Sequence, residues 1–200
     1  MGFPKLTELK EIITALIKGP YTSGFPYKKI KVPDRFKGKP VFNEDFCVGC
    51  TACVSVCPAK ALEFKDEIYN GKAKRVLKIR WDRCIFCGNC EANCLTEKGI
   101  KLSSEFDLAT LKERDSLVQE IEKELLLCEN CNEIIAPVDQ LFWVINKLGP
   151  LYTSNTTLVF FKQKFLNISD SVKKQENEIL RSDRFSLLCP RCRRKVVFIS

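Results

Sequence analysis

Histidine is absent from this 200-residue chain. Imidazole is the commonest metal ligand in proteins and shares many zinc sites with cysteine. Without it, every site for a soft metal in this protein must be built from thiolates alone. The absence therefore excludes mixed cysteine–histidine sites and directs attention to the cysteines.

Long apolar segments are missing as well. No stretch approaches the ~20 consecutive apolar residues that a transmembrane helix needs, so we expect no membrane span. Met1 is followed by a polar-rich segment rather than a long apolar region, and we therefore expect no secretory signal. Cysteines in a chain without such a signal are expected to bind metal in a reducing compartment rather than to form disulfides.

The sequence also lacks the usual arrangements of catalytic residues. It has no glycine-rich phosphate loop, no nucleophile paired with a base, and no metal site with a free coordination position. This pattern favours electron transfer over turnover of a substrate. We therefore expect a protein with no independent active site.

Cysteine is present in excess. The twelve cysteines fall into three sets of four. Two sets share the spacing C-x2-C-x2-C-x3-C and lie 37 residues apart: CVGCTACVSVCP begins at Cys47 (the first run) and CIFCGNCEANCL begins at Cys84 (the second run). The third set consists of two C-x2-C pairs with 57 residues between them: Cys128, Cys131, Cys189 and Cys192.

The spacing of the two runs is typical of a two-cluster bacterial ferredoxin, in which each half lends its fourth cysteine to the other cluster. A short loop wraps three thiolates around three irons, and the fourth ligand comes from the far side of the fold. We therefore predict two 4Fe–4S clusters; disulfides or scattered core cysteines are the disfavoured alternative. The predicted ligands are Cys47, Cys50, Cys53 and Cys94 for the first cluster and Cys84, Cys87, Cys90 and Cys57 for the second.

The third set predicts a further metal site. Four thiolates from two C-x2-C pairs make a closed tetrahedral site, which usually holds zinc. The second pair reads C-P-R-C, which also resembles rubredoxin, so one rubredoxin-like iron is the alternative to one Zn²⁺. Because all four positions around the ion would be filled by protein, we expect this site to be structural.

The formal net charge of +8 would ordinarily suggest a nucleic-acid partner. A 4Fe–4S core or a divalent ion held by four thiolates carries about −2. Three such sites lower the charge of the loaded protein to about +2, so much of the excess lysine and arginine balances the sites. We expect no nucleic acid, and a nucleic-acid-binding zinc-ribbon protein is the weaker alternative.

Apolar residues recur at helical spacing near the N-terminus, at Leu6, Leu9, Ile13 and Leu16. They predict an amphipathic helix over 4–18. One interpretation packs this helix on its own domain; the other docks it on a partner or a membrane surface. We favour docking, because a long proline-containing arm follows the helix rather than a compact unit.

The expected fold class is α+β. A two-cluster bacterial-ferredoxin-like core carries an N-terminal amphipathic helix and arm, and a C-terminal zinc-ribbon or rubredoxin-like four-cysteine domain follows it. The expected divisions are 1–40 for the helix and extended basic arm, 41–104 for the two-cluster ferredoxin domain, 105–127 for a linking helix, and 128–200 for the four-cysteine metal domain with its long insert.

Local patterns predict further elements. Residues 73–81 alternate and predict a strand, whereas the apolar residues of 105–127 recur in an imperfect helical stripe. Within the insert we expect a helix over 137–148, a strand over 157–161 and a polar surface stretch over 169–184. The terminal segment RRKVVFIS predicts a final strand.

The segment before the first run, FPYKKIKVPDRFKGKP, resembles the arm of the complex I ferredoxin-type (23 kDa-type) subunit. That family carries an R-[FY]-[KR]-G motif, here Arg35-Phe36-Lys37-Gly38. The order of helix, arm, first run, DRCIFCGNC and two final C-x2-C pairs is more similar still to the ferredoxin subunit of formate hydrogenlyase and related group 4 membrane-bound hydrogenases. Leu95 replaces the family's proline, and one residue is added near Lys98, so we expect a looser turn after Cys94.

The resemblance implies an electron-transfer subunit in the peripheral arm of a membrane-bound hydrogenase-like or complex I-like oxidoreductase. Its implied partners are a cluster-bearing small subunit, a catalytic large subunit and a membrane arm. The implied location is the cytoplasmic face of the cell membrane, with the N-terminal helix near the membrane arm. A freely soluble two-cluster ferredoxin is the alternative, although a diffusing carrier needs neither the helix nor the arm.

Overall fold

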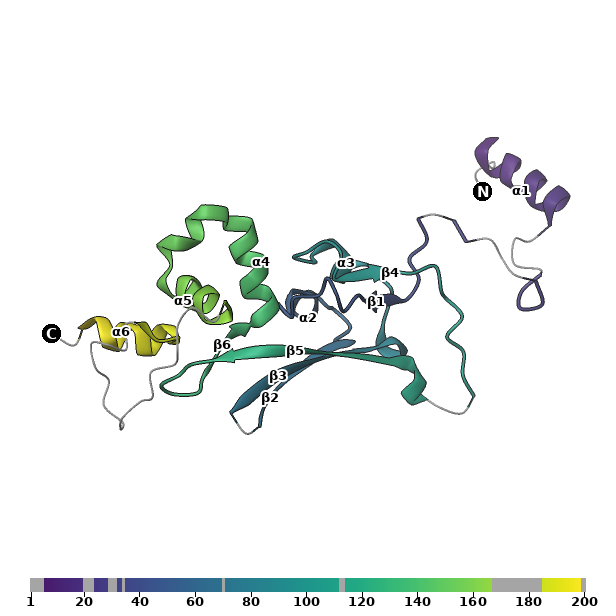
Figure 1. The fold of residues 1–200 in the computed structure, drawn as a ribbon. Helices are drawn as coiled ribbons and strands as arrows, with labels where there is room; N and C mark the ends of the chain where they lie inside the picture. Colours follow the sequence, from purple (N-terminus) through teal and green to yellow (C-terminus); the bar gives the residue numbers. More distant parts are fainter. Residues whose placement is uncertain are drawn as a thin grey trace. The chain divides into compact units, whose positions relative to one another are not determined.

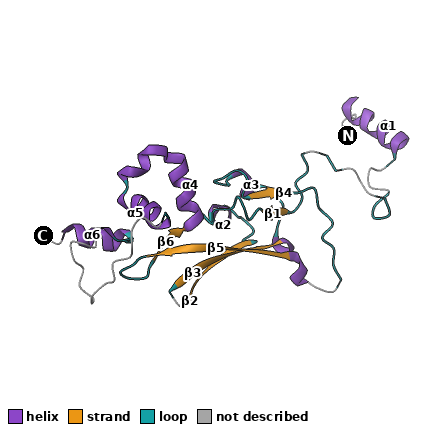
Figure 2. Cartoon of the chain, in the orientation of Figure 1, coloured by secondary structure: helices purple, strands orange, loops and turns teal. Residues whose placement is uncertain are grey.

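The computed structural model describes residues 6–19, 24–28, 32–33, 35–69, 71–111, 114–166 and 185–198. The chain divides into two units, Met1–Phe36 and Lys37–Ser200. Figure 1 colours them along the sequence, and Figure 2 marks their helices and strands.

The first unit contains helix α1, Leu6–Lys18, which confirms the predicted N-terminal helix. Gly19 ends it at a positive φ of 68°, and its N–H donates to the Ala15 carbonyl at 3.0 Å. Glycine suits this left-handed position because it has no Cβ to clash. No residue of α1 is buried in the structure, so its apolar stripe faces solvent.

The second unit is built on a four-stranded antiparallel sheet in the order β2-β3-β5-β6. The strands are β2 Leu62–Tyr69, β3 Lys72–Arg80, β5 Val118–Leu127 and β6 Ile134–Pro137. Strand β3 confirms the strand predicted for 73–81. Because side chains alternate along a strand, Leu77 and Ile121, which are register partners, both reach the inner face and are buried.

The cysteine runs lie on the inner face of this sheet (Figure 1). Each run contains one short helix, α2 Ala52–Ser55 in the first and α3 Asn89–Ala92 in the second. A two-stranded antiparallel sheet of β1 Pro40–Phe42 and β4 Ile100–Leu102 accompanies them. The shared core consists of Phe42, Cys53, Leu62, Leu77, Ile79, Cys90, Ile100 and Ile121.

The linking helix predicted for 105–127 is wrong. A short 3-10 turn, Arg114–Leu117, leads directly into strand β5. Residues on β5 alternate, with Ile121, Lys123 and Leu125 buried and the glutamates between them exposed. Since β5 pairs with β3, the expected boundary at residue 104 runs through the sheet. The division into four parts remains a prediction.

The insert packs a second core on the end of the sheet. Helix α4, Val138–Leu148, confirms the helix predicted there, and a 3-10 segment, Gly149–Ser154, follows it. The strand predicted for 157–161 is wrong, because helix α5 spans Thr156–Phe165. The Asn155 side chain caps α5 by accepting from the N–H groups of Thr157 and Leu158 at 3.0 and 3.3 Å. The core residues are Val138, Leu141, Ile145, Leu158, Phe161 and Leu187.

The strand predicted at the C-terminus is also wrong, because helix α6 spans Pro190–Phe198. Pro190 stands at the first helical position, where its missing N–H costs nothing. Cys192 and Val196 lie one helical turn apart and are both buried. The polar stretch predicted for 169–184 lies outside the described residues.

These elements make a mixed helix-and-strand protein with a ferredoxin-like cysteine core and a C-terminal group of four cysteines. None of the helices described is both long enough and apolar enough to cross a membrane.

Candidate metal centres

Two cavities on the inner face of the sheet each collect four cysteines. One is lined by Cys47, Cys50, Cys53 and Cys94, and the other by Cys57, Cys84, Cys87 and Cys90. The fourth cysteine of each run thus lies beside the first three cysteines of the other run. This grouping is required if each run lends its fourth cysteine to the other cluster. That ligation itself stays a prediction.

The two runs repeat in backbone conformation as well as in sequence. Two residues with positive φ in the first run and one just after it have counterparts 37 residues later, and all six φ angles lie in the left-handed region that side chains rarely adopt. The pairs are Gly49 (71°) with Phe86 (54°), Thr51 (62°) with Gly88 (84°), and Lys60 (49°) with Glu97 (60°). The same turn therefore wraps each cavity, which fits two copies of one bound group.

Burial makes two of these thiols poor acids by themselves. It raises the pKa of Cys53 to about 12 and the pKa of Cys90 to about 11, and neighbouring thiolates reinforce both shifts. Because iron–sulfur clusters are held by thiolates, binding must release these protons. Four convergent cysteines fit a 4Fe–4S cluster, which cysteine thiolates hold.

The turn after Cys94 is held more firmly than the sequence suggests. The Thr96 hydroxyl donates to the Phe46 carbonyl at 2.9 Å and accepts from the Gly99 N–H at 3.0 Å. These bonds tie the turn to the residue just before the first run. Thr96 was missed by sequence reasoning, which predicted a looser turn where Leu95 replaces proline.

Lys37 and Gly38, the last two residues of the R-F-K-G motif, contact the second run and the segment after β4. The Gly38 N–H donates to the Ser103 carbonyl at 3.0 Å, just beyond β4, and the Lys37 ammonium donates to the Cys87 carbonyl at 3.0 Å. A Cβ at Gly38 would lie 2.4 Å from the Ser103 oxygen and 2.5 Å from the Glu105 oxygen. Only glycine allows the backbones to approach this closely.

Gly38→Ala is therefore expected to destabilise the protein by about 3 kcal/mol or more, the upper end of the usual cost of overpacking. The new methyl group meets two backbone oxygens, which cannot move aside as a flexible side chain can. Denaturant unfolding followed by cluster absorbance measures the effect. Gly24→Ala is the matched control, because its Cβ would meet only the flexible Lys28 side chain, at 3.2 Å. Equal unfolding midpoints for the two variants would contradict the explanation.

Two cations that sequence reasoning missed hold the first run against the sheet. The Arg75 guanidinium, on β3, donates to the Gly49 carbonyl at 2.9 Å and forms a two-pronged ion pair with Asp66 at 2.7 and 2.8 Å. The Lys123 ammonium, on β5, donates to the Glu44 carbonyl at 2.6 Å and to Asp139 at 2.9 Å. The sequence could have indicated both residues, because each is a charged residue at an inward-facing position of a strand whose apolar and polar side chains alternate.

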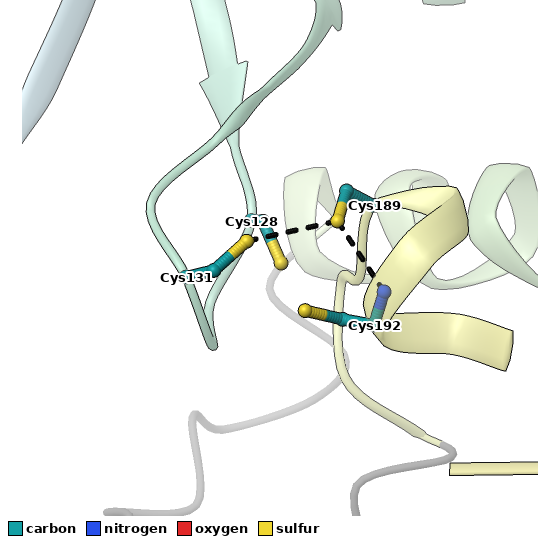
Figure 3. A group of neighbouring side chains, drawn as sticks. All are labelled: Cys128, Cys131, Cys189 and Cys192. Carbon is teal, nitrogen blue, oxygen red and sulfur yellow. Dashed lines mark hydrogen bonds between the residues drawn. The ribbon is translucent and has the colours of Figure 1, made fainter. Parts of the chain in front are cut away.

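The third set of cysteines forms one compact group. Their four sulfurs all lie within 4.8 Å of one another, and those of Cys131 and Cys189 are 3.6 Å apart. Four thiolates about 2.3 Å from a tetrahedral zinc lie about 3.8 Å apart, so this group can hold a metal ion. Figure 3 shows Cys128 and Cys131 at the end of the β5–β6 hairpin facing Cys189 and Cys192 at the start of α6.

Hydrogen bonds lower the pKa of one thiol of this group. Burial opposes ionisation of Cys128, yet N–H groups of Cys189, Cys131 and Asn130 hold its pKa to about 7. The Asn130 amide also donates to the Cys192 sulfur at 3.3 Å. The expected zinc-ribbon form is not confirmed, since the second pair opens a helix rather than a hairpin.

Comparison with known proteins agrees with this geometry. The 4Fe-4S dicluster domain family matches residues 46–98. Formate hydrogenlyase subunit 6 of Escherichia coli is 36% identical over 142 residues, which are 70% of this chain and 73% of that protein. NADH-quinone oxidoreductase subunit I 2 of Geobacter metallireducens is 32% identical over 122 residues, 58% of this chain and 92% of that protein.

Among solved structures, a chain of the membrane-bound sulfane sulfur reductase, an archaeal respiratory membrane complex, is 26% identical. The match covers 58% of this chain and 62% of that one, with a TM-score of 0.38, which supports no argument about the fold. The identity to the two relatives, together with the share of their length that the matches cover, is sufficient to show the family without that structure. The chain belongs to the family of 4Fe–4S electron-transfer subunits that includes formate hydrogenlyase subunit 6 and NADH-quinone oxidoreductase subunit I.

Proposed function

We propose that this protein relays electrons through two 4Fe–4S clusters in the peripheral arm of a membrane-bound hydrogenase-like or complex I-like oxidoreductase. The observation that carries the proposal is the pair of cavities, each lined by four cysteines drawn from both runs. Family membership supplies the class of complex. The chain has no active site of its own in this proposal; the chemistry belongs to a partner.

The ligands are assigned from the cavity linings. Each bound cluster supplies one-electron redox chemistry. The protein holds it with thiolates and keeps water away with apolar side chains, and solvent exposure is one of the levers on reduction potential. The first cluster is held by Cys47, Cys50, Cys53 and Cys94, and the second cluster by Cys84, Cys87, Cys90 and Cys57.

The third set holds one Zn²⁺ in this proposal. Four convergent sulfurs and the absence of histidine from the sequence fit a closed all-thiolate site. Zinc has no redox chemistry, so the site stabilises structure by joining the β5–β6 hairpin to α6. A rubredoxin-like iron is the alternative that elemental analysis distinguishes.

The partners proposed are a small subunit with a further cluster, a catalytic large subunit and a membrane arm. The proposed location is the cytoplasmic face of the membrane, without insertion. Helix α1 supports attachment to another surface, since Leu6 and Leu16 are 86% and 80% exposed. An apolar stripe of this kind is stabilised when a partner covers it.

The full-length protein and a variant lacking residues 1–19 test the proposal together. Both should contain about eight iron atoms per chain in the two clusters and show the EPR signals of two reduced clusters. Only the full-length chain should purify with a membrane complex, because the deletion removes the exposed apolar stripe. The measurements are iron analysis, EPR and the subunits recovered from solubilised membranes.

Glu11→Gln is the matched control, because it changes the polar side of α1 and should leave attachment intact. Loss of both clusters in the truncated variant would show that α1 belongs to the core. A full-length chain with both clusters and no attachment to membranes would instead support the freely soluble carrier.

A further inference from the structure

Lys123 occupies an unusual place on the sheet. It lies between Ile121 and Leu125 on the inner face of β5, where an apolar residue is expected. Its side chain is 9% exposed, and within the residues whose burial the structure describes it is the one charged residue that is buried. Burying an ammonium group is costly even when the group is paired.

The cost is increased by its neighbour across the sheet. Arg75 on β3 is the register partner of Lys123, and like charges directly opposite each other destabilise a sheet. Both cations reach the same segment, since Arg75 donates to the Gly49 carbonyl and Lys123 to the Glu44 carbonyl. A Cβ built on Gly49 would lie 3.2 Å from the Lys123 Cβ, so the first run passes directly over this lysine.

The charge of Lys123 is only partly neutralised at this place. Its partner carboxylate, Asp139, is 48% exposed, so water screens the negative end of the pair more than the buried positive end. The ammonium lies against the first run: it donates to the Glu44 carbonyl at 2.6 Å, three residues before Cys47, and the backbone at Gly49 passes over its side chain. Lys123 therefore stabilises negative charge at the first cavity.

The second run has no matching buried cation in the described part of the chain. The cations in contact with it are exposed: the Lys37 ammonium donates to the Cys87 carbonyl at 3.0 Å, and the Lys101 ammonium pairs with Glu91 at 3.0 Å. Water and salt screen an exposed charge strongly. The two cavities are thus alike in ligands and backbone but different in electrostatic surroundings.

We propose that Lys123 sets the electron affinity of the first cluster: its buried ammonium raises the reduction potential there and leaves that of the second cluster unchanged. The inference rests on the proposed function, because it takes the two clusters as given. The reasoning is that a cluster gains one negative charge on reduction and that a nearby cation favours the more negative form. Lys123 acts through space, from behind the loop that carries Cys47.

The test is an EPR-monitored redox titration of the full-length protein and of Lys123→Met, which keeps the unbranched side chain and removes the charge. The equilibrium constant for reducing the first cluster should fall about tenfold, which is about 59 mV for a one-electron couple. The second cluster should not shift. The two signals are assigned with Cys57→Ser, which is expected to perturb the second cluster.

Three further variants separate the charge from the packing. Lys123→Arg should retain the higher potential, and Asp139→Asn should raise it, because the screening carboxylate is lost while the cation stays. Lys78→Met is the matched control: Lys78 pairs with Glu120 on the opposite face of the same sheet. It should leave both potentials unchanged.

An unchanged first potential in both Lys123→Met and Asp139→Asn would overturn the inference, as would equal shifts of the two clusters or an equal shift in Lys78→Met. If Lys123→Met loses its iron, the test is the reduction potential of the first cluster in Asp139→Asn, which the inference expects to rise. Absence of the clusters from the unmodified protein would overturn the proposed function instead, so the two failures are distinguishable.

Discussion

Cys57→Ser is expected to remove or alter the cluster held by Cys84, Cys87 and Cys90 and to spare the other cluster. Cys57 belongs to the first run in sequence but lines the cavity of the second. Serine is a much poorer ligand for iron than a thiolate. If the altered cluster is lost altogether, iron should fall from about eight to about four atoms per chain. EPR of the reduced protein and iron analysis measure the result.

The mirror variant, Cys94→Ser, is the matched control. It should affect the cluster held by Cys47, Cys50 and Cys53, because Cys94 lines that cavity. Should Cys57→Ser alter only the signal that Cys94→Ser was expected to change, each run would bind its own cluster and the crossed assignment would be wrong.

The cysteine groupings follow from sequence because ligand chemistry restricts them. A cluster needs four thiolates, and a short loop can supply three of them only at fixed spacing. The same reasoning cannot supply the interactions that hold those loops. Thr96 and Arg75 act through contacts with residues 50 and 26 positions away in the sequence, and their residue types alone do not mark them.

Strand β5 shows why the helix predicted for 105–127 failed. Glutamate, lysine and leucine are good helix formers, and they dominate residues 118–127. Lys123 interrupts the apolar alternation at an inward position, which hides the period of two. Pairing with β3 decides the outcome, since it buries Ile121 and Leu125 against the cysteine core. The residue that obscured the strand pattern, Lys123, is therefore the one that we propose raises the reduction potential of the first cluster.

The strands predicted where helices α5 and α6 lie were wrong for a related reason. The apolar and β-branched residues of TTLVF and KVVF favour strands locally. Tertiary packing overrides that preference: Leu158 and Phe161 lie three residues apart on α5 and are both buried. For α6 the overriding contact is with the third set of cysteines, because Val196 packs beside Cys189 and Cys192.

Cys189→Ser is expected to release about one metal ion per chain and to destabilise residues 128–200. Cys128 and Cys189 are almost completely buried, so the variant leaves the remaining thiols in a site without its full coordination. Binding at a structural metal site contributes directly to the free energy of folding. Closing a loop of 57 residues costs about 4 kcal/mol in chain entropy, and the metal offsets this cost. Hydrogen exchange should show lost protection in α6 and in the β5–β6 hairpin.

Both EPR signals should survive in Cys189→Ser, because none of the four cysteines of the third set lines either cluster cavity. Lys195→Ala is the matched control, since it changes an exposed side chain of α6 and should retain the metal. Elemental analysis of the unmodified protein identifies the ion: about one zinc per chain supports a structural site. A ninth iron with a rubredoxin-like visible spectrum would make the site redox-active, and loss of either cluster signal in Cys189→Ser would show that it is coupled to the electron path.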